Sequence, residues 1–298
     1  MSTARTAAST LAHVPGPADQ NIAVRVKPAA ERALQEGHPW LFAGSIRQQS
    51  REGAPGDLAV VFDRKGRFLA VGLYDPHSSI RIRLLQHREP APIGRDWFAA
   101  QLTAAAARRA PLRDRPSATR TTGYRLVHGE NDGLPGLVVD RYGETLVIKL
   151  YTVAWMPHLL DVLDALDDIA PAERVVLRLG RAAQEQEAAL HDLTDGSLLS
   201  GPPLDGPVLF WENGLRFEVD PIHGQKTGFF LDQRENRARV EPLAAGKDVL
   251  NLFAYTGGFA VYAARGGARK VVDVDTSAPA LKAAARNMAH NRHIPAVA

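Results

Sequence analysis

The first part of the chain alternates hydrophobic and polar residues over short stretches, a pattern typical of strands that are buried on one side. Turn-forming sequences separate four such stretches, at residues 22–26, 57–63, 68–74 and 79–85. A short helix is predicted at Pro28 to Gln35, with the proline in its first turn. So many short strands in so little chain predict a small β-barrel or sandwich over residues 21–95.

The strand at 79–85 has the clearest alternation. Ile80, Ile82 and Leu84 fall on one face, whereas Arg81 and Arg83 fall on the other. We therefore expect an apolar inner face and an arginine outer face that suits a barrel holding RNA outside. Lys and Arg outnumber Asp and Glu by 8 over residues 21–120, and basic surfaces of this kind bind phosphates. A merely solvated, arginine-rich face explains the charge equally well.

Helical and strand patterns mix in the middle of the chain. Helices are predicted at 97–110, where Pro111 would end the helix, and at 156–168; strands are predicted at 124–128, 136–140, 145–151 and 174–179. This indicates a compact α/β module over residues 96–205. Its last part, within 181–207, is polar and then rich in Gly and Pro, which is typical of a linker.

From residue 206 onward the pattern changes again. Asn213-Gly214 lies between two apolar stretches and predicts a tight hairpin. A turn, a helix and then strand–helix repeats follow, which is the order of a parallel sheet covered by helices. The expected fold class is thus α/β multidomain: an N-terminal β-barrel, a central strand–helix–strand domain and a Rossmann-like third region.

The stretch from Val249 to Asp275 carries the clearest chemistry. An apolar strand leads into the small-residue loop Ala254-Tyr255-Thr256-Gly257-Gly258, and a second strand, 270–274, ends at Asp275. An acid about 20 residues after such a loop can bind ribose hydroxyls. The G-x-G-x-x-G spacing of a dinucleotide site is absent, so we favour S-adenosylmethionine over NAD. A plain tight turn at the glycines and a helix-entry role for Asp275 remain the simpler alternative.

A second cluster, at residues 226–234, places two aromatic residues beside Asp232, Gln233 and Arg234. These side chains could cover an adenine and hold amino and carboxyl groups of a ligand. Alternatively Asp232 only caps a helix, Phe230 is buried and Arg234 is exposed. The spacing does not decide between the two.

Other signals exclude more than they assign. The sequence contains no cysteine, which excludes disulfides and thiolate sites and is compatible with a cytoplasmic location. No apolar run approaches the length of a membrane helix, so no membrane partner is expected.

The run His128 to Gly133 is more typical of a turn than of an acid–base pair, and His290 and His293 alone are too few ligands for a metal ion. We assign no catalytic residue and no metal site. Residues 1–20, rich in Ala, Ser and Thr, are expected to form a disordered tail.

The motif blocks at 226–234, 251–259 and 274–277 resemble the ribosomal RNA large-subunit methyltransferase I family, whose members methylate C5 of a cytosine. Residues 37–42 and 75–78 resemble the N-terminal PUA domain of that family, and 129–137 resemble its central domain. The resemblance implies a PUA-like RNA-binding domain at 21–95, a central domain at 96–205, and the N-terminal part of a class I methyltransferase domain at 206–298. It also implies ribosomal RNA as the partner.

By position, the resemblance implies two sets of site residues. S-adenosylmethionine would contact Phe230, Asp232, Gln233, Arg234, Asn251, Tyr255, Thr256, Gly257, Gly258 and Asp275. RNA would contact His38, Trp40, Arg81 and Arg83.

One departure from the family matters for activity. Members of the family continue beyond the matched region, with an Asp-Pro-Pro-type motif and a cysteine nucleophile, and this chain has neither. We therefore expect a shortened enzyme that is inactive or impaired, with an RNA-binding protein without catalysis as the alternative. The strand 249–253 would present an open apolar sheet edge, which favours pairing with another chain, such as a homodimer.

Overall fold

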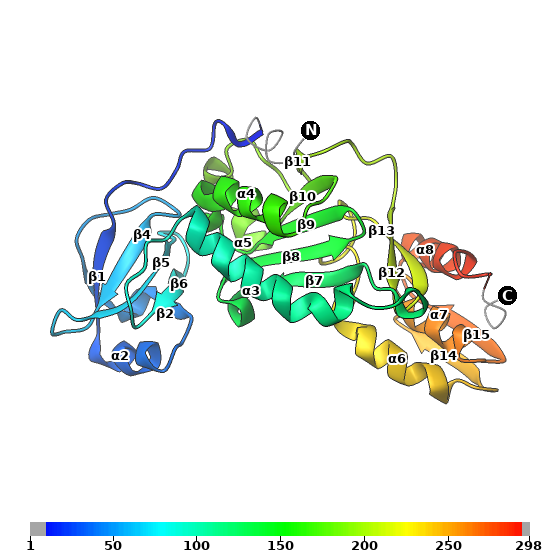
Figure 1. Ribbon diagram of the computed structural model, residues 1–298. Helices are drawn as coiled ribbons and strands as arrows, with labels where there is room; N and C mark the ends of the chain where they lie inside the picture. Colours follow the sequence, from blue (N-terminus) through cyan, green and yellow to red (C-terminus); the bar gives the residue numbers. More distant parts are fainter. Residues whose placement is uncertain (1–9, 294–298) are drawn as a thin grey trace. The chain divides into compact units, whose positions relative to one another are not determined.

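The computed structural model describes residues 10–293, which form two compact units (Figure 1). Unit 1 contains residues up to 108 together with 126–140 and 146–203. Unit 2 contains residues 109–125, 141–145 and those from 204 onward. The second unit carries the predicted cofactor motifs, so each unit is described by itself.

The first sheet of unit 1 has six strands in the order β2-β6-β5-β4-β1-β3. The strands are β1 (Ile22–Val26), β2 (Trp40–Phe42), β3 (Ile46–Gln49), β4 (Leu58–Phe62), β5 (Phe68–Tyr74) and β6 (Ile80–His87), with the helix α2 (Pro28–Gln35). In β1 alternate side chains are buried, as a strand with one solvent-facing side requires. The buried residues of β1 pack with those of β4 and β6 and with Leu34 of α2 in one core cluster.

Arg83 on β6 overturns part of the prediction for this sheet. Its side chain is buried, with 7% of the residue exposed, so it does not belong to an arginine surface. A side chain added at Gly136 would lie only 3.1 Å from the Arg83 Nε, which shows that residues of the central module cover this face of β6. Burial lowers the pKa of Arg83, against the attraction of Asp75 and Glu130. Alternation correctly placed Ile82 and Leu84 inside but could not show that the opposite face is covered too.

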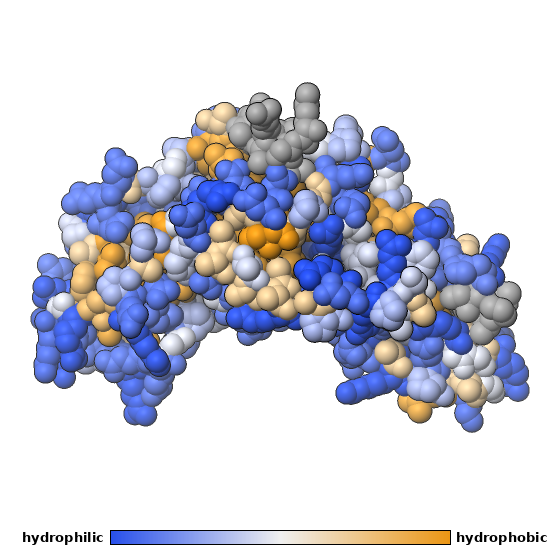
Figure 2. Space-filling view, in the orientation of Figure 1, coloured by the Kyte–Doolittle hydropathy of each residue, from blue (hydrophilic) through white to orange (hydrophobic). Residues whose placement is uncertain are grey.

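A five-stranded sheet in the order β11-β10-β9-β8-β7 lies mostly in unit 1, and the ends of β7, β8 and β9 belong to unit 2. Its elements are α3 (Arg95–Arg113), β7 (Gly123–His128), β8 (Leu137–Tyr142), β9 (Thr145–Leu150), α4 (Leu159–Ile169), β10 (Arg174–Leu179), α5 (Arg181–Gln184) and β11 (Leu198–Ser200). Apolar side chains gather over the α3 and α4 region of the surface, and hydrophilic ones dominate around the first sheet (Figure 2).

Two predictions for this region are wrong in detail. The predicted linker at 181–207 contains β11, which pairs antiparallel with β10 through Val175–Ser200 and Val176–Leu198. Gly201 makes the close return possible, because its φ is +90° and a Cβ there would lie 2.0 Å from the Glu173 carbonyl oxygen. Pro111 lies inside α3 instead of ending it, since the helix continues to Arg113.

The predicted tail also differs where the structure describes it. Leu11 is buried, and the Ala18 N–H donates a hydrogen bond of 3.0 Å to the Asp57 carboxylate. Leu11 and Ala18 therefore contact the rest of unit 1, whereas most residues of 10–20 are exposed. Residues 1–9 lie outside the described residues.

The part of unit 2 after residue 204 begins with the hairpin of β12 (Val208–Glu212) and β13 (Leu215–Val219). Asn213 and Gly214 both have positive φ, 49° and 78°, as the predicted turn requires. The helix α6 (Arg234–Leu243) follows, then β14 (Asp248–Leu252), α7 (Gly258–Arg265), β15 (Lys270–Val274) and α8 (Ala278–Ala289). The Ser277 side chain caps α8 by accepting the Ala280 N–H. Short 3-10 turns lie at Ala43–Ser45, Ser117–Thr119, Gly129–Asp132, Val153–His158, Glu187–Ala189 and Leu231–Gln233.

The sheet of β14 and β15 is covered on one side only. The two strands pair in parallel, and α7 and α8 pack against them. Four apolar residues of this sheet stay exposed: Leu250 61%, Leu252 55%, Val272 39% and Val274 46%. Phe253, the residue after β14, is 90% exposed. Within residues 10–293 no other strand pairs with β14, so its outer edge is open, as the sequence predicts.

Candidate functional site

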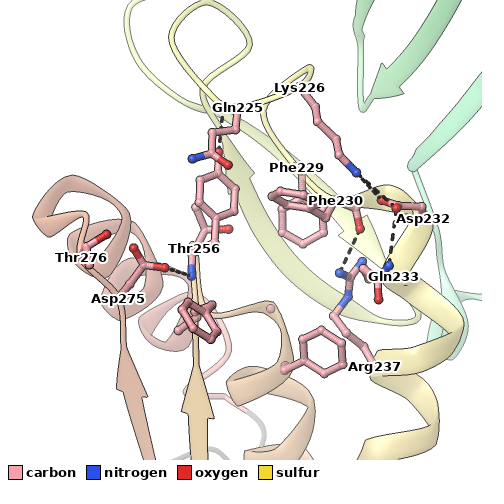
Figure 3. A pocket seen from close by; sticks show the side chains of 15 residues that line it. Gln225, Lys226, Phe229, Phe230, Asp232, Gln233, Arg237, Thr256, Asp275 and Thr276 are labelled. Carbon is pink, nitrogen blue, oxygen red and sulfur yellow. Dashed lines mark hydrogen bonds and ion pairs between the residues drawn. The ribbon is translucent and has the colours of Figure 1, made fainter.

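A pocket of about 590 Å³ lies in unit 2, between the β14–α7 loop and the segment that leads into α6 (Figure 3). Its volume is in the range of small-molecule sites in proteins. The residues that line it are Gln225, Lys226, Phe229, Phe230, Asp232, Gln233, Arg237, Phe253, Ala254, Tyr255, Thr256, Gly258, Phe259, Asp275 and Thr276. Five of these are aromatic, and both signs of charge are present.

Asp275 lies at the end of β15, where parallel strands commonly present ligand-binding groups. Its Oδ2 accepts the Tyr255 N–H at 2.8 Å, and its Oδ1 accepts the Ser277 N–H at 2.8 Å. These backbone hydrogen bonds hold the pKa of Asp275 below its ordinary value, so the group is ionised at neutral pH. A carboxylate oxygen accepts two hydrogen bonds, so Oδ1 and Oδ2 can each take a hydroxyl of a vicinal diol as well.

The β14–α7 loop is tightly folded around small residues. Gly257 has a φ of +72° and precedes α7 as its N-cap. A Cβ at Gly257 would lie 2.7 Å from the Ala284 Cβ on α8, so only glycine allows this approach. Phe253 and Tyr255 also have positive φ, 56° and 48°, which is a strained conformation for aromatic residues. Such strain is concentrated at functional sites.

The wall opposite Asp275 is a turn closed by a hydrogen bond of 2.7 Å from the Gly228 N–H to the Gln225 carbonyl. The Tyr255 hydroxyl fixes this turn, since it accepts the Gln225 N–H at 3.0 Å and donates to the Gly228 carbonyl at 3.0 Å. The two walls of the pocket are therefore linked through one side chain. At the tip of the turn, Lys226 forms an ion pair with Asp232 (Figure 3).

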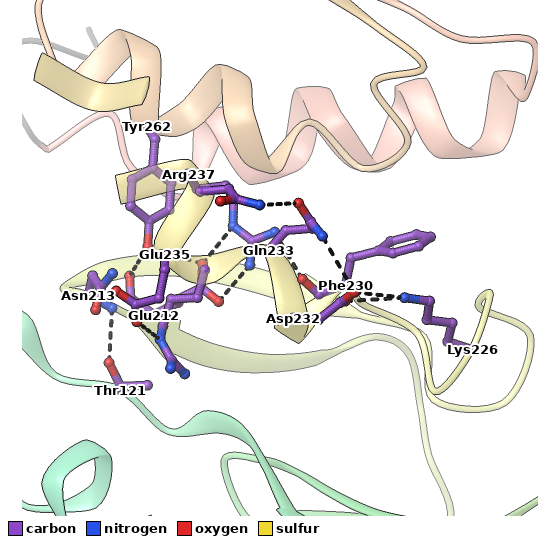
Figure 4. Close-up of polar contacts among 12 residues, drawn as sticks. Thr121, Glu212, Asn213, Lys226, Phe230, Asp232, Gln233, Glu235, Arg237 and Tyr262 are labelled. Atoms are coloured by element: carbon purple, nitrogen blue, oxygen red, sulfur yellow. Dashed lines mark hydrogen bonds and ion pairs between the residues drawn. The ribbon is translucent and has the colours of Figure 1, made fainter. Parts of the chain in front are cut away.

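Arg237 of α6 lines the pocket (Figure 3) and forms the polar contacts drawn in Figure 4. Its Nε and Nη2 pair with the two carboxylate oxygens of Glu212 at 2.8 and 2.7 Å, and both side chains are almost fully buried. Its Nη1 donates to the Phe230 carbonyl at 3.0 Å, and its guanidinium lies 4.7 Å from the centre of the Phe229 ring. The Tyr262 hydroxyl donates to the same Glu212 carboxylate at 3.0 Å. This network ties the pocket segment to the β12–β13 hairpin.

The pocket brings together seven of the ten residues that the sequence predicts for a cofactor: Phe230, Asp232, Gln233, Tyr255, Thr256, Gly258 and Asp275. Three others do not line it. Asn251 donates to Asp273 at 2.7 Å, Arg234 pairs with its neighbour Glu235, and Gly257 packs against α8.

Sequence reasoning missed several lining residues. Arg237 lies three residues after the motif, and its place in the pocket depends on its ion pair with the buried Glu212, which is distant along the chain. Lys226 was part of the motif but its position against Asp232 depends on the turn at Gly228, which no local pattern specifies. Phe253 and Phe259 line the pocket because of the conformation of the loop between β14 and α7, which the sequence does not show.

The four residues predicted to contact RNA, His38, Trp40, Arg81 and Arg83, also differ in exposure: His38 is exposed and Arg83 is buried. His38 is exposed, and its ring lies 5.9 Å from that of Trp40. Trp40 donates its indole N–H to Glu130 at 3.0 Å, and Phe42 beside it is 44% exposed. Arg81 lies with its guanidinium 5.8 Å from the Tyr74 ring and donates to backbone carbonyls of the turn before β6. Of the four predicted RNA residues, His38 and the half-buried Trp40, beside the exposed Phe42, have the character of a surface for bases.

Residues 10–293 contain neither a metal cluster nor a membrane-spanning helix. No three side chains of the His, Asp and Glu types come close enough to hold a metal ion. No helix in this part of the chain has the length and apolar character needed to cross a bilayer.

Family comparisons agree with this architecture. Residues 24–87 match the PUA-like domain family, and residues 124–296 match the S-adenosylmethionine-dependent methyltransferase family. A ribosomal RNA large subunit methyltransferase of Deinococcus radiodurans is 52% identical over 284 residues, which are 95% of this chain and 69% of that protein. The chain belongs to the ribosomal RNA large subunit methyltransferase family. A large subunit methyltransferase I of Photobacterium profundum is 40% identical over 88% of the chain and 64% of the relative. The chain thus spans about two thirds of the length of these relatives.

Solved structures of other methyltransferases share the fold of this family member. A SAM-dependent methyltransferase from Streptococcus mutans superposes with a TM-score of 0.75 at 22% identity, over 91% of this chain and 67% of its own. A methyltransferase complexed with SAH gives 0.77 at the same identity and coverage. The predicted fold class is confirmed: a PUA-like N-terminal β domain is followed by the α/β fold of S-adenosylmethionine-dependent methyltransferases. The exact domain limits, after residues 20, 95 and 205, stay a prediction.

Proposed function

We propose that this chain binds S-adenosylmethionine in the pocket of unit 2 and serves the methylation of large-subunit ribosomal RNA. The observation that carries the proposal is Asp275, an ionised carboxylate at a strand end, oriented by two backbone N–H groups and facing an aromatic-lined pocket. Its oxygens would accept the ribose hydroxyls, while Thr256 and Gly258 allow the close approach of backbone that a nucleoside needs. Phe230 and its neighbours up to Gln233 would close over the ligand.

The pocket fits this cofactor better than a dinucleotide. Its volume accommodates one nucleoside with an amino-acid tail, and its lining has no turn of the pyrophosphate-binding type. Bound there, the cofactor would supply an electrophilic methyl group. The chain's own residues would orient the nucleoside and exclude water from the aromatic-lined side.

Equilibrium binding tests this directly. We expect S-adenosylhomocysteine to bind the 298-residue chain and NAD not to bind detectably, as measured by isothermal titration calorimetry. D275N should lower the affinity for S-adenosylhomocysteine by about tenfold or more, because a charge-assisted hydrogen bond to a ribose hydroxyl is lost. Preferential binding of NAD, or full affinity in D275N, would refute the assignment.

We further propose cytosine C5 as the methylated position, with this polypeptide impaired in the transfer itself. C5 is activated when a thiolate attacks C6 of the ring, and these 298 residues contain no cysteine. The cofactor and RNA surfaces would be present, but no nucleophile of the required kind. Transfer of labelled methyl groups to ribosomal RNA measures this impairment, and robust turnover by the chain would contradict it.

Because ribosomal RNA would be the substrate, we propose the cytoplasm as the place of action.

For RNA contact we propose the aromatic group of the exposed His38 and Phe42 and the half-buried Trp40, in place of an arginine surface on β6. Unpaired bases stack on aromatic rings, and the Phe42 side chain, 44% exposed, lies 6.2 Å from the His38 ring between ring centres. H38A should weaken binding of a large-subunit RNA fragment several-fold in fluorescence anisotropy. If R83A weakens RNA binding without changing the thermal stability of unit 1, the arginine surface is restored and this proposal fails.

A further inference from the structure

We propose that the outer face of the first sheet binds one unpaired nucleotide of an RNA strand, in a hollow beside Arg25. The phosphate would pair with the Arg25 guanidinium, and the base would lie against the Phe62 ring. The inference rests on RNA as the partner of the chain, but not on the cofactor pocket of unit 2 or on the aromatic group at His38.

The hollow is a cavity of about 300 Å³ that lies within unit 1 alone. Its volume is at the lower end of the range for small-molecule sites, which suits a single nucleotide. The residues that line it are Ala23, Arg25, Gln48, Ser50, Phe62 and Gly66.

Three neighbouring strands bring these residues together. β1 lies between β4, which is beside it in Figure 1, and the edge strand β3. Arg25 of β1 is paired in register with Phe62 of β4 and with Gln48 of β3. Because Val24 and Val26 on either side of Arg25 are fully buried in the core, the Arg25 side chain belongs to the outer face. The hollow is therefore built on the strands of a sheet and not on a loop.

The polar groups of the hollow are available to a ligand. Arg25 and Gln48 are exposed, and within residues 10–293 neither side chain has a hydrogen-bond or ion-pair partner. The Ser50 Oγ accepts the Ala23 N–H at 3.0 Å, so its own hydroxyl hydrogen can donate to a ligand. A guanidinium suits a phosphate, and an amide with a hydroxyl suits the edge of a base or a ribose hydroxyl.

Phe62 supplies an apolar wall beside these groups. It is half-buried, whereas its neighbour Val61 is fully buried in the core. Every base has a face that can stack on an aromatic ring, so a ring with a cation next to it matches a base that carries a phosphate. An acidic peptide could pair with Arg25 but would leave the ring unused.

The surroundings of the hollow are cationic. Arg47 of β3 and Lys65 of the turn after β4 are exposed, and neither has a carboxylate partner in the part of the chain that the structure describes. The nearby Asp63 carboxylate is occupied, since it accepts the N–H groups of Lys65 and Arg67 and the Arg67 Nε. Part of the basic excess over residues 21–120 thus lies here, and not on β6, where Arg83 is buried. Neighbouring phosphates of the same strand would meet these cations.

Fluorescence anisotropy of the full chain with a labelled, mixed-sequence single-stranded oligoribonucleotide tests the site. R25M should lower the affinity by about fivefold or more, because a charge-assisted hydrogen bond is lost. It should also reduce the slope of log affinity against log salt by about 0.7, the value of one phosphate contact on a single strand. F62L removes the ring but no charge, so it should lower the affinity by about fivefold or more with the salt slope unchanged.

R181M on α5 is the matched control, since it removes an arginine of the same unit whose side chain is 94% exposed and outside the hollow. We expect it to change the affinity by less than about twofold. A fully paired duplex of the same sequence should bind without an effect of F62L, because its bases are not free to stack.

The proposal is overturned if R25M binds the single strand like R181M, or if R25M loses affinity with no change of salt slope. It is also overturned if F62L weakens the duplex and the single strand equally, since the ring would then act only through the fold. Should F62L loosen the sheet, as seen in near-ultraviolet circular dichroism, R25M decides the question alone. An original chain that binds no RNA would overturn this site together with the proposed RNA substrate, whereas the cofactor site is judged separately by calorimetry.

Discussion

The Arg237–Glu212 ion pair allows the sharpest prediction about stability. R237M keeps most of the side-chain volume but removes the cation from a carboxylate that is fully buried. Removing one partner of a buried ion pair costs about 3–5 kcal/mol, because the other charge is left without compensation. The Tyr262 hydroxyl still donates to Glu212, which places the expected loss at the lower end, about 3 kcal/mol.

Two further variants isolate the cause. In the double variant R237M/E212L no charge is left buried, and replacing a buried pair with apolar residues is about neutral, so most of the loss should be recovered. R265M removes a similar two-bond pair, Arg265 with Glu241, whose side chains are 21% and 24% exposed. Its loss should be smaller, about 1–2 kcal/mol.

Native-state hydrogen exchange is the suitable assay, because a chain with two compact units has no single unfolding transition. The amides of β12 and β13 report the local free energy of opening in unit 2. The reasoning is refuted if R237M lowers that free energy by less than about 1 kcal/mol. It is also refuted if the double variant is no more stable than R237M, since the cost would then not come from an uncompensated carboxylate.

Three other predictions concern the same unit. G257A should lower the free energy of unfolding of unit 2 by about 2–4 kcal/mol in hydrogen-exchange experiments, because an alanine there has a positive φ and its Cβ meets Ala284 on α8. G246A, with φ +66° and no atom within 4 Å of the added Cβ, should lower it by only about 1–2 kcal/mol. Equal losses would show that the contact with α8 contributes nothing. Burial raises the pKa of Asp273 above 3.8, so its folded state prefers the neutral form, and stability present below pH 3.8 is lost as pH rises through the raised value. D273N should therefore stabilise β14 and β15 at pH 7 but not at pH 3, and a pH-independent effect would disprove the linkage. Y255F should lower S-adenosylhomocysteine affinity several-fold in calorimetry, because the turn at Gly228 loses its hydroxyl anchor; an unchanged affinity would show that the turn holds itself.

The sequence predicted most elements of the fold because their patterns are local. The helix at Pro28 to Gln35 and the strand at 174–179 have the predicted bounds, since periodicity and end signals coincide there. The strand β11 was missed because three residues, Leu198–Ser200, are too short to show a period, and its pairing with β10 is a tertiary contact.

The same division applies to the site. Asp275 and the loop up to Gly258 follow from their order along a strand–loop–helix unit, which sequence alone records. Arg83 was placed on a surface because alternation shows two faces of a strand but not what covers the second one. The positions of Lys226 and Arg237 depend on a turn and a buried carboxylate that are distant along the chain, so only the folded structure brings them to the pocket.

The uncovered face of β14 and β15 has a consequence for handling the protein. Salts such as sulfate strengthen the association of apolar surfaces, so solubility should fall steeply with added ammonium sulfate, and the dye ANS should fluoresce on binding to the native chain. Leu252→Lys would place a charge in the middle of this strip and should abolish dye binding without touching the pocket. The sedimentation coefficient of the original chain should rise with concentration as copies associate through the strip, and that of the lysine variant should not.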